Sequence, residues 1–302
     1  MIETRIKKII KEKGPVTGAE LLDVIDEDPL ILWRACHLSK DLAIRVVGTR
    51  YLRFDRRLEG FARLSPSILR EFLTYSIIGL SNDPALLEIR VKKVLSHIEE
   101  VSRAKSDLAY NVVSALAGRL SDSLLIKEQA CFIIAGDIVF NMAHDVPRPE
   151  RSTGKIVKGS DMDIVVIVDD NFSRRQIKRL DEEIYKEKYR LLINPHLKEE
   201  IDYIVKDLNR VKRQLRFDTF KHMVACKILQ EGTLLYGSEE IFHTVKTLLK
   251  ENGIIEKISA MAEGARAFRK KAKEYLVRED PLKIKEENLD LFYPTEESEE
   301  FE

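Results

Sequence analysis

The stretch KGSDMDIVVIVDD, residues 158–170, decides the fold of the central part of this 302-residue chain. Five consecutive apolar residues, 164–168, predict a strand that is buried on both faces and therefore lies in the middle of a sheet. Side chains two positions apart on a strand point to the same side. Asp161 and Asp163 are therefore expected to leave one face together, at the start of a rigid strand.

Two carboxylates held side by side favour a bound cation. Their like charges make it costly to keep both groups ionised unless a cation neutralises them. Carboxylate oxygens are hard ligands, which suit Mg²⁺ or Mn²⁺. The acids at the other end of the run, Asp169 and Asp170, instead fit a turn that caps the helix expected to begin near Ser173.

Two further strands are predicted around this one. CFIIAGD, residues 131–137, predicts a short buried strand that ends at Gly136, and EIDYIV, residues 200–205, predicts a later strand that carries Asp202. The charged segment between the second and third strands, residues 173–190, predicts a helix.

These motifs resemble the DNA polymerase β-like nucleotidyltransferase superfamily over residues 131–240. The family pattern is a strand ending in Gly-Ser or Gly-Gly, an Asp-x-Asp on the next strand, and a third acid on a later strand. The resemblance implies that Asp161 and Asp163 ligate two Mg²⁺ or Mn²⁺ ions and that Asp202 completes the site. It implies an NTP substrate, with Asp202 also the candidate acceptor of the attacking hydroxyl's proton.

The expected nucleotide contacts include one departure from the family pattern. Asp137 stands where the family has Ser or Gly, and a carboxylate there repels phosphates unless it binds metal or turns away. The phosphate contact then comes from Gly159 and Ser160, or from the loop 141–158. The loop carries four cations, which fit solvated side chains equally well: Arg148, Arg151, Lys155 and Lys158.

A helix after the third strand supplies one more candidate. In relatives this helix packs beside the nucleotide, so the resemblance implies a phosphate contact for Lys221, although a solvated helix face fits the same residue. The predicted nucleotide-binding residues are Gly136, Asp137, Gly159, Ser160 and Lys221.

Residues 1–64 predict a winged helix-turn-helix module. Three short helices are expected, the second opened by the capping box of Thr17 and Glu20. LAIRVVGTRYLRFD, residues 42–55, has two alternating apolar runs around Gly48, which predict a β-hairpin that forms the wing. A module of this kind serves either to bind nucleic acid or only to pack and dimerise.

The charge distribution favours a nucleic-acid partner at this end of the chain. The formal net charge is zero, but residues 42–63 carry six Arg against two acids, whereas residues 278–302 carry three basic residues against ten acidic ones. Arg45, Arg50 and Arg53 are the predicted contacts to an RNA or DNA backbone, with ordinary exposed hairpin positions as the alternative.

The remaining segments complete an α+β protein of about two domains by length. Helices are expected over residues 65–130 and 241–302, the latter ending in an acidic tail, with a turn at 235–238. The predicted domains are 1–64, 65–130, 131–240 and 241–302. The three cysteines form no CxxC pair, and neither a signal peptide nor an apolar run of membrane length is found, so the expected compartment is the cytoplasm without a membrane partner.

Taken together, the sequence predicts a metal-dependent nucleotidyltransferase. It would transfer a nucleoside monophosphate from an NTP to a hydroxyl of RNA, protein or a small molecule and release pyrophosphate. The alternative is a winged-helix DNA-binding regulator with an inactive or ligand-sensing nucleotidyltransferase-like domain. This hypothesis rests on Asp137, which stands where an active family member has Ser or Gly. A third hypothesis is a structural interaction protein built on the helical segments.

Overall fold

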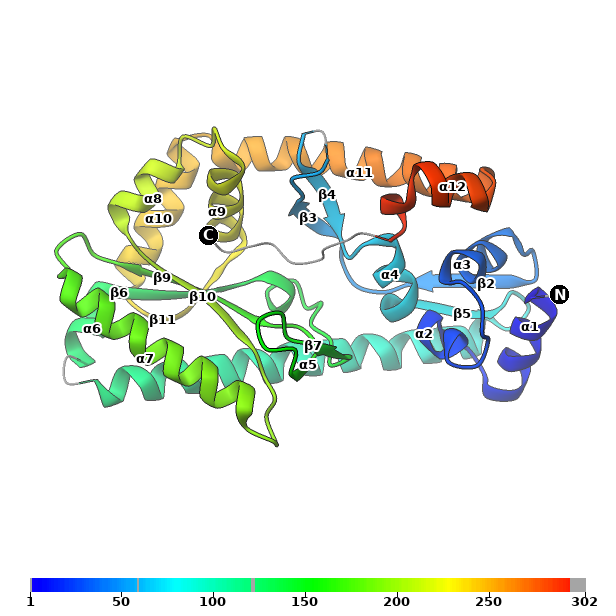
Figure 1. The fold of residues 1–302 in the computed structure, drawn as a ribbon, viewed down its shortest axis with the longest axis horizontal. Helices are drawn as coiled ribbons and strands as arrows, with labels where there is room; N and C mark the ends of the chain where they lie inside the picture. Colours follow the sequence, from blue (N-terminus) through cyan, green and yellow to red (C-terminus); the bar gives the residue numbers. More distant parts are fainter. Residues whose placement is uncertain (1, 59, 121–122, 294–302) are drawn as a thin grey trace. The chain divides into compact units, whose positions relative to one another are not determined.

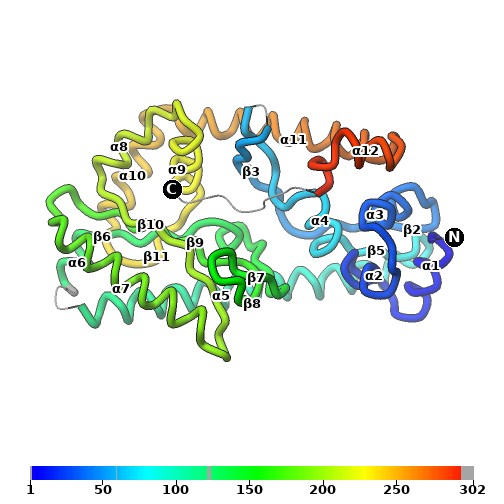
Figure 2. Tube along the Cα trace, viewed as in Figure 1, coloured from blue at the N-terminus to red at the C-terminus, as the bar shows by residue number. Residues whose placement is uncertain are grey.

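The computed structural model describes residues 2–58, 60–120 and 123–293 (Figure 1). In that part of the chain twelve α-helices and four sheets form a mixed α+β protein, which confirms the predicted fold class. The described residues divide into two compact units, the first made of 2–97 with 260–293 and the second of 98–259. The divisions fall inside two long helices, α5 (Pro84–Arg119) and α11 (Ile254–Arg278), which can be followed along the trace in Figure 2.

The first unit begins with the three predicted helices, α1 (Ile2–Lys13), α2 (Gly18–Leu22) and α3 (Pro29–Leu38). The capping box is confirmed, because the Glu20 backbone N–H donates to Thr17 Oγ1 and the Thr17 N–H donates to the Glu20 carboxylate at 2.7 Å. The apolar sides of these helices form the core of the unit around the fully buried Trp33.

The predicted wing hairpin of residues 42–55 is wrong. Strand β2 (Leu42–Val46) pairs with β5 (Ser76–Leu80), which also pairs with β1 (Val16–Thr17). Strand β3 (Tyr51–Phe54) pairs in a second sheet with β4 (Ala62–Ser65).

The physical reason for this pairing is burial. Residues 76–79, which the sequence placed in a helical region, instead form a strand that is buried at all four positions, and this interior strand pairs with β2. Gly48, at φ +72°, turns the chain away between β2 and β3.

The rest of the first unit is helical. It comprises α4 (Ile68–Tyr75), α12 (Pro281–Glu287) and the short 3₁₀ turn η2 (Leu289–Leu291). The end of the predicted acidic tail, residues 294–302, lies outside the described residues.

The second unit is built on a four-stranded sheet with the order β10-β9-β6-β11. Strand β9 (Met162–Val168) is central, antiparallel to β6 (Ala130–Ala135) and parallel to β10 (Ile201–Asp207). Every residue of 164–168 is buried, which confirms the predicted central strand.

The fourth strand, β11 (Thr233–Gly237), pairs with β6 and replaces the turn expected at 235–238. Gly237 lies within the predicted turn, but in the structure it lets the backbone of β11 approach the backbone of β6 closely. It lies at φ +95°, and a Cβ on it would meet the carbonyl oxygen of Ala130 at 2.2 Å. Glycine here lets two backbones come together, so the turn prediction was wrong.

Helices cover both faces of this sheet (Figure 1). One side holds α7 (Arg174–Ile193), α6 (Ser123–Gln129) and the second half of α5, whereas the other holds α8 (Leu208–Gln214), α9 (Phe220–Glu231) and α10 (Glu239–Glu251). A short 3₁₀ turn, η1 (Gly136–Ile138), follows β6, and the hairpin of β7 (Pro147–Pro149) and β8 (Ile156–Lys158) leads into β9.

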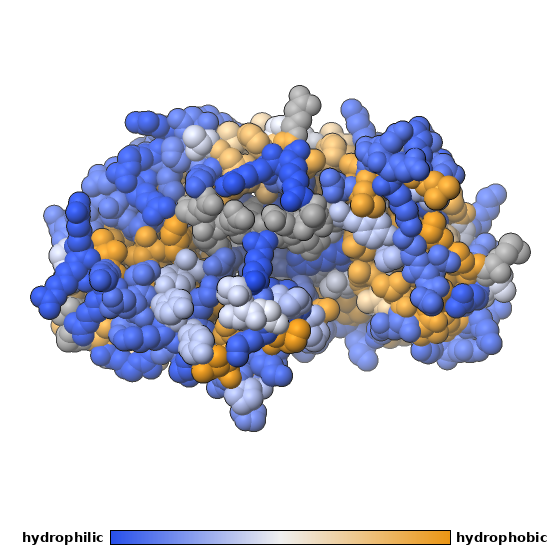
Figure 3. Space-filling view, viewed as in Figure 1, coloured by the Kyte–Doolittle hydropathy of each residue, from blue (hydrophilic) through white to orange (hydrophobic). Residues whose placement is uncertain are grey.

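The surface matches the high charged fraction of the sequence. Hydrophilic residues predominate on the face shown in Figure 3, with scattered apolar patches between them. Among the described helices, none combines the length and the apolar character that crossing a bilayer requires.

A buried carboxylate in the first unit generates a stability prediction. Glu71 on α4 forms ion pairs with Arg50 at 2.7 Å, with Arg269 at 3.4 Å and with Lys273. Burial by itself raises the pKa of Glu71, but the three cations outweigh it and hold the pKa below its ordinary value. Glu71→Ala is expected to lower the free energy of unfolding by about 3 kcal/mol at neutral pH, because it removes the buried carboxylate that three partly buried cations share.

The measurement is chemical denaturation, with the exposed Glu274→Ala as the matched control, expected to change stability by less than about 0.5 kcal/mol. The pKa of Glu71 is lower in the folded protein than in the unfolded chain, where it has its ordinary value of 4.5. Glu71 therefore contributes fully to the free energy of unfolding above pH 4.5, and this contribution shrinks as the pH falls through the folded pKa. Equal effects of the two substitutions would contradict the assignment.

Candidate active site

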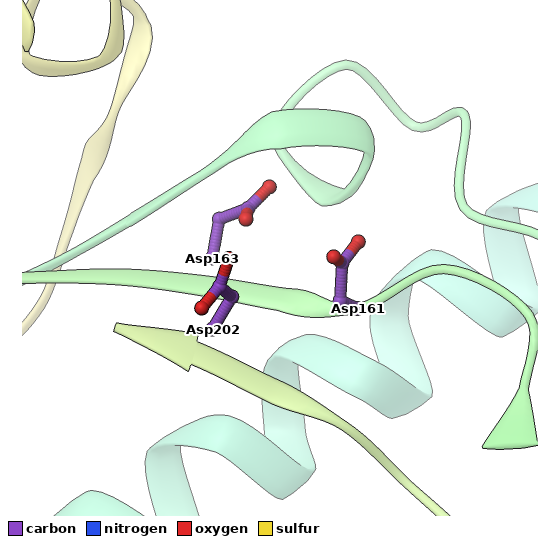
Figure 4. A group of neighbouring side chains, drawn as sticks. All are labelled: Asp161, Asp163 and Asp202. Carbon is purple, nitrogen blue, oxygen red and sulfur yellow. The ribbon is translucent and has the colours of Figure 1, made fainter. Parts of the chain in front are cut away.

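Three carboxylates meet at the starts of two neighbouring parallel strands. Asp163 on β9 lies directly opposite Asp202 on β10, and Asp161 immediately precedes β9. One oxygen of each carboxylate lies within 4.8 Å of one oxygen of both others. Figure 4 shows Asp161 and Asp163 leaving the same side of β9, with Asp202 beside them on the next strand.

This donor set fits a divalent metal ion. It consists of three hard carboxylate oxygens on half-buried side chains, two of them on strands and the third on the residue immediately before β9. Mg²⁺ is usually bound by one or two carboxylates, with water and substrate phosphates filling the remaining positions, so partly exposed groups suit it.

The electrostatics of the site leave negative charge incompletely neutralised. Burial raises the pKa of Asp202, the charge of Asp161 adds to that effect, and Lys188 on α7, whose Nζ lies 3.7 Å from Asp202, opposes it. A divalent cation placed among these carboxylates would relieve their repulsion.

Glu200 is a fourth acid that the sequence analysis missed. The Met162 N–H donates to the Glu200 carbonyl at 2.9 Å, which sets Glu200 beside the start of β9. Burial, followed by the charge of Asp161, raises the pKa of the Glu200 carboxyl. Glu200 stands two residues before Asp202, so the alternation rule that paired Asp161 with Asp163 was the signal that could have found it.

Arg148 on β7 compensates part of this acidic edge. Its guanidinium lies 2.8 Å from Glu200 Oε2 and 3.6 Å from Asp161 Oδ2, and its Nε donates to the Gly159 carbonyl at 2.7 Å. The sequence analysis grouped Arg148 with the loop cations that either meet phosphate or are solvated. In the described chain it is held against the carboxylates instead.

The glycine that ends β6 is required by packing against the site. Gly136 has φ +71°, and a Cβ on it would lie 1.9 Å from Asp163 Oδ2. Its N–H donates to Glu231 Oε1 at 3.3 Å, and that oxygen also accepts from the buried Lys227 at 2.9 Å. The Gly136 backbone and the Asp163 carboxylate are thus in direct contact.

Asp137 is engaged by the turn that precedes Asp161. The Ser160 hydroxyl donates to Asp137 Oδ2 at 2.7 Å and accepts from the His144 N–H at 3.2 Å. Gly159 makes the turn possible, because at φ +63° it packs against the His144 carbonyl, where a Cβ would lie 1.8 Å from the oxygen. These contacts gather Gly136, Asp137, Gly159 and Ser160 around the carboxylates.

The other predicted site residues lie elsewhere. Lys221, in the first turn of α9, lines a cavity to which none of the three aspartates contributes. Arg45 on β2 pairs with Glu88 at 3.4 Å, and Arg50 with the buried Glu71, while Arg53 lies on β3 in the other sheet. Nucleic-acid contact by these three arginines stays a prediction.

Comparison with known proteins bears on the segment that carries the carboxylates. Residues 151–226 match the family described as nucleotidyltransferase domain. The match covers 76 of the 302 residues and includes all three aspartates, but it begins after Gly136 and Asp137. No curated protein and no solved structure matches the chain. The nucleotidyltransferase match supports nucleoside monophosphate transfer as the general activity and suggests an enzyme.

The contact between Gly136 and Asp163 predicts the effect of adding one methyl group. Gly136→Ala is expected to weaken Mn²⁺ binding about 10-fold or more, because the new Cβ displaces the Asp163 carboxylate. The measurement is calorimetric titration of Mn²⁺ into the folded protein.

Gly154→Ala is the matched control. Gly154 has a similar φ of +69° with no atom within 4 Å of an added Cβ, so this substitution adds the backbone strain without the clash. It is expected to cost about 1 kcal/mol of stability and to leave Mn²⁺ affinity unchanged within about 2-fold. Equal loss of affinity in both variants would show that the clash with Asp163 is not the cause.

Proposed function

We propose that this protein transfers a nucleoside monophosphate from an NTP to an acceptor hydroxyl and releases pyrophosphate. The observation that carries the proposal is the convergence of Asp161, Asp163 and Asp202 within 4.8 Å, inside the segment that matches the nucleotidyltransferase domain. These three residues would hold Mg²⁺ or Mn²⁺. The ions, when bound, would lower the pKa of the attacking hydroxyl and neutralise charge on the triphosphate.

The chain's own groups have separate tasks in this proposal. Asp202 accepts the proton of the attacking hydroxyl as the new oxygen–phosphorus bond forms and the bond to pyrophosphate breaks. Its raised pKa, caused by burial and by Asp161, suits a proton acceptor. Asp161 and Asp163 would hold the cations, whose charge would favour binding of the phosphate end of the substrate.

The turns around the carboxylates would receive the nucleotide. Gly136 and Gly159 present backbone without side-chain bulk, and Ser160 holds Asp137 by a hydrogen bond. Because Asp137 Oδ2 accepts this hydrogen bond, the Asp137 carboxylate is held by Ser160, which supports a triphosphate site here despite the acid at position 137. Lys221 stays a predicted nucleotide contact with no support from its surroundings, because the cavity that it lines includes none of the three aspartates.

The acceptor is a hydroxyl of RNA, a protein or a small molecule. An RNA or DNA strand held by the first unit, through Arg45, Arg50 and Arg53, is one form of this proposal. The alternative, a winged-helix DNA-binding regulator, depended on a wing hairpin, and β2 and β3 belong to different sheets. The enzyme is therefore the better-supported function.

Labelling experiments test the activity and the acceptor together. The protein is incubated with each α-labelled NTP, Mg²⁺ or Mn²⁺, and cellular RNA and protein, and the labelled fraction is identified. Asp161→Asn and Asp163→Asn are expected to reduce incorporation by roughly 10³-fold, because each removes a charge that holds the cations.

Asp169→Asn is the matched control, since Asp169 lies just beyond the far end of β9 and accepts from the Asn171 N–H. It is expected to keep activity within about 3-fold. Label that survives in Asp161→Asn, or that is lost equally in the control, would remove the support for the site.

Asp202→Ala separates chemistry from binding. It is expected to abolish transfer while leaving NTP affinity within about 3-fold, because Asp202 acts on the attacking side rather than on the triphosphate. Single-turnover rates and equilibrium binding of a non-hydrolysable NTP analogue measure the two effects. Near-normal turnover in this variant would exclude Asp202 as the proton acceptor.

A further inference from the structure

A basic cavity lies between α8 and the start of α9. Its volume is about 240 Å³, and five residues line it: Arg210, Arg213, Gln214, Lys221 and His222. The two arginines are three positions apart on α8, which places them on the same side of the helix. In the part of the chain that the structure describes, no carboxylate lines the cavity.

Among the described residues, the two arginines have no counter-ion. Within the described ranges, no carboxylate lies within ion-pair distance of Arg210 or Arg213. Two neighbouring side chains do contact a carboxylate, since Lys212 pairs with Asp170 at 3.3 Å and the His222 ring nitrogen Nδ1 lies 2.6 Å from Asp218 Oδ1. The positive charge therefore gathers on the side of α8 that faces the cavity.

A buried lysine lies behind the cavity wall. Lys206 on β10 is 4% exposed, and its Nζ donates to the Oε1 of the cavity residue Gln214 at 3.0 Å. No carboxylate of the described residues lies within 4.0 Å of this Nζ. Burial, with a further contribution from the charge of Arg210, lowers the pKa of Lys206 to about 7. A buried cation without a counter-ion is costly, and an anion in the cavity would reduce that cost.

The cavity is separate from the carboxylate site. Lys206 lies four positions beyond Asp202 on the same strand, which corresponds to about 13 Å along β10. Arg210 follows the end of β10, so the cations gather at the opposite end of the strand from the acids.

We propose that this cavity binds a phosphate group, supplied either by a nucleic-acid backbone or by a free phosphate anion. Arginine favours phosphate because its planar guanidinium donates two parallel hydrogen bonds to phosphate oxygens. This site goes beyond the proposed transferase function, because it uses none of the metal-binding residues and needs no catalytic turnover.

The test is carried out on the full chain in EDTA, so that no metal-bound triphosphate at the carboxylates contributes. Two probes are used: inorganic phosphate, followed by calorimetry, and a fluorescein-labelled single-stranded 12-nucleotide RNA, followed by anisotropy. The cavity variant is Arg210→Gln with Arg213→Gln. The matched control is Lys212→Gln with Arg216→Gln, which removes the same charge from the same segment at exposed positions outside the cavity.

The cavity variant is expected to weaken binding about 10-fold or more, whereas the control changes it by no more than about 3-fold. Binding of RNA alone assigns the phosphate to a strand, and binding of inorganic phosphate with the same dependence on the variants assigns it to a free anion. Either result supports the site. Equal loss in both double variants would show diffuse charge attraction and overturn the proposal, as would failure of both probes to bind the unaltered protein.

A single substitution guards against misfolding of the double variant. Lys221→Gln, compared with Lys250→Gln at an exposed position on α10, removes one cavity cation while leaving both arginines in place. It is expected to weaken binding by about 3-fold or more relative to that control. Because no step of nucleotide transfer is measured, loss of this site and loss of transferase activity are distinguishable.

Discussion

The parallel register of β9 and β10 is the constraint on which the candidate site depends. It sets Asp163 opposite Asp202 and brings three like-charged groups within 4.8 Å of one another. Carboxylates at this distance repel, so mobile loops would let them separate. The central strand resists separation because each of its last five residues is buried between two layers of helices. Hydrophobic burial thus holds the charges in a geometry that favours divalent cations.

The surroundings of the site show how closely the chain packs around these charges. Gly136 and Gly159 adopt positive φ angles and approach Asp163 and the His144 carbonyl at distances that exclude a side chain. Arg148 balances part of the negative charge from outside the strands. The three aspartates are half-buried, and Arg148 compensates only part of their charge.

The second unit carries opposite charges at the two ends of β10. Acids gather where the strand begins. Beyond its end lie two arginines that have no counter-ion among the described residues, and Lys206, near the end of the strand itself, is buried. Without divalent cations, the acidic end of β10 would repel a polyanion. The arginine end would attract it whether or not divalent cations are present. If both proposals hold, the two regions would bind phosphate separately, and only the carboxylate region would require metal.

Local patterns determined much of this protein. The apolar run of 164–168, the alternation that places Asp161 and Asp163 on one side, and the capping box at Thr17 all act over a few residues, so the sequence alone predicted them. Tertiary structure decided which strands pair. Strand β2 pairs with β5 rather than β3, and β11 joins β6 where a turn was expected, because partners distant in sequence compete by how much apolar surface they bury. The same distance explains the contacts of Arg148 with Asp161, of Lys188 with Asp202 and of Glu231 with Gly136, which join residues 13 to 95 positions apart and leave no local signal.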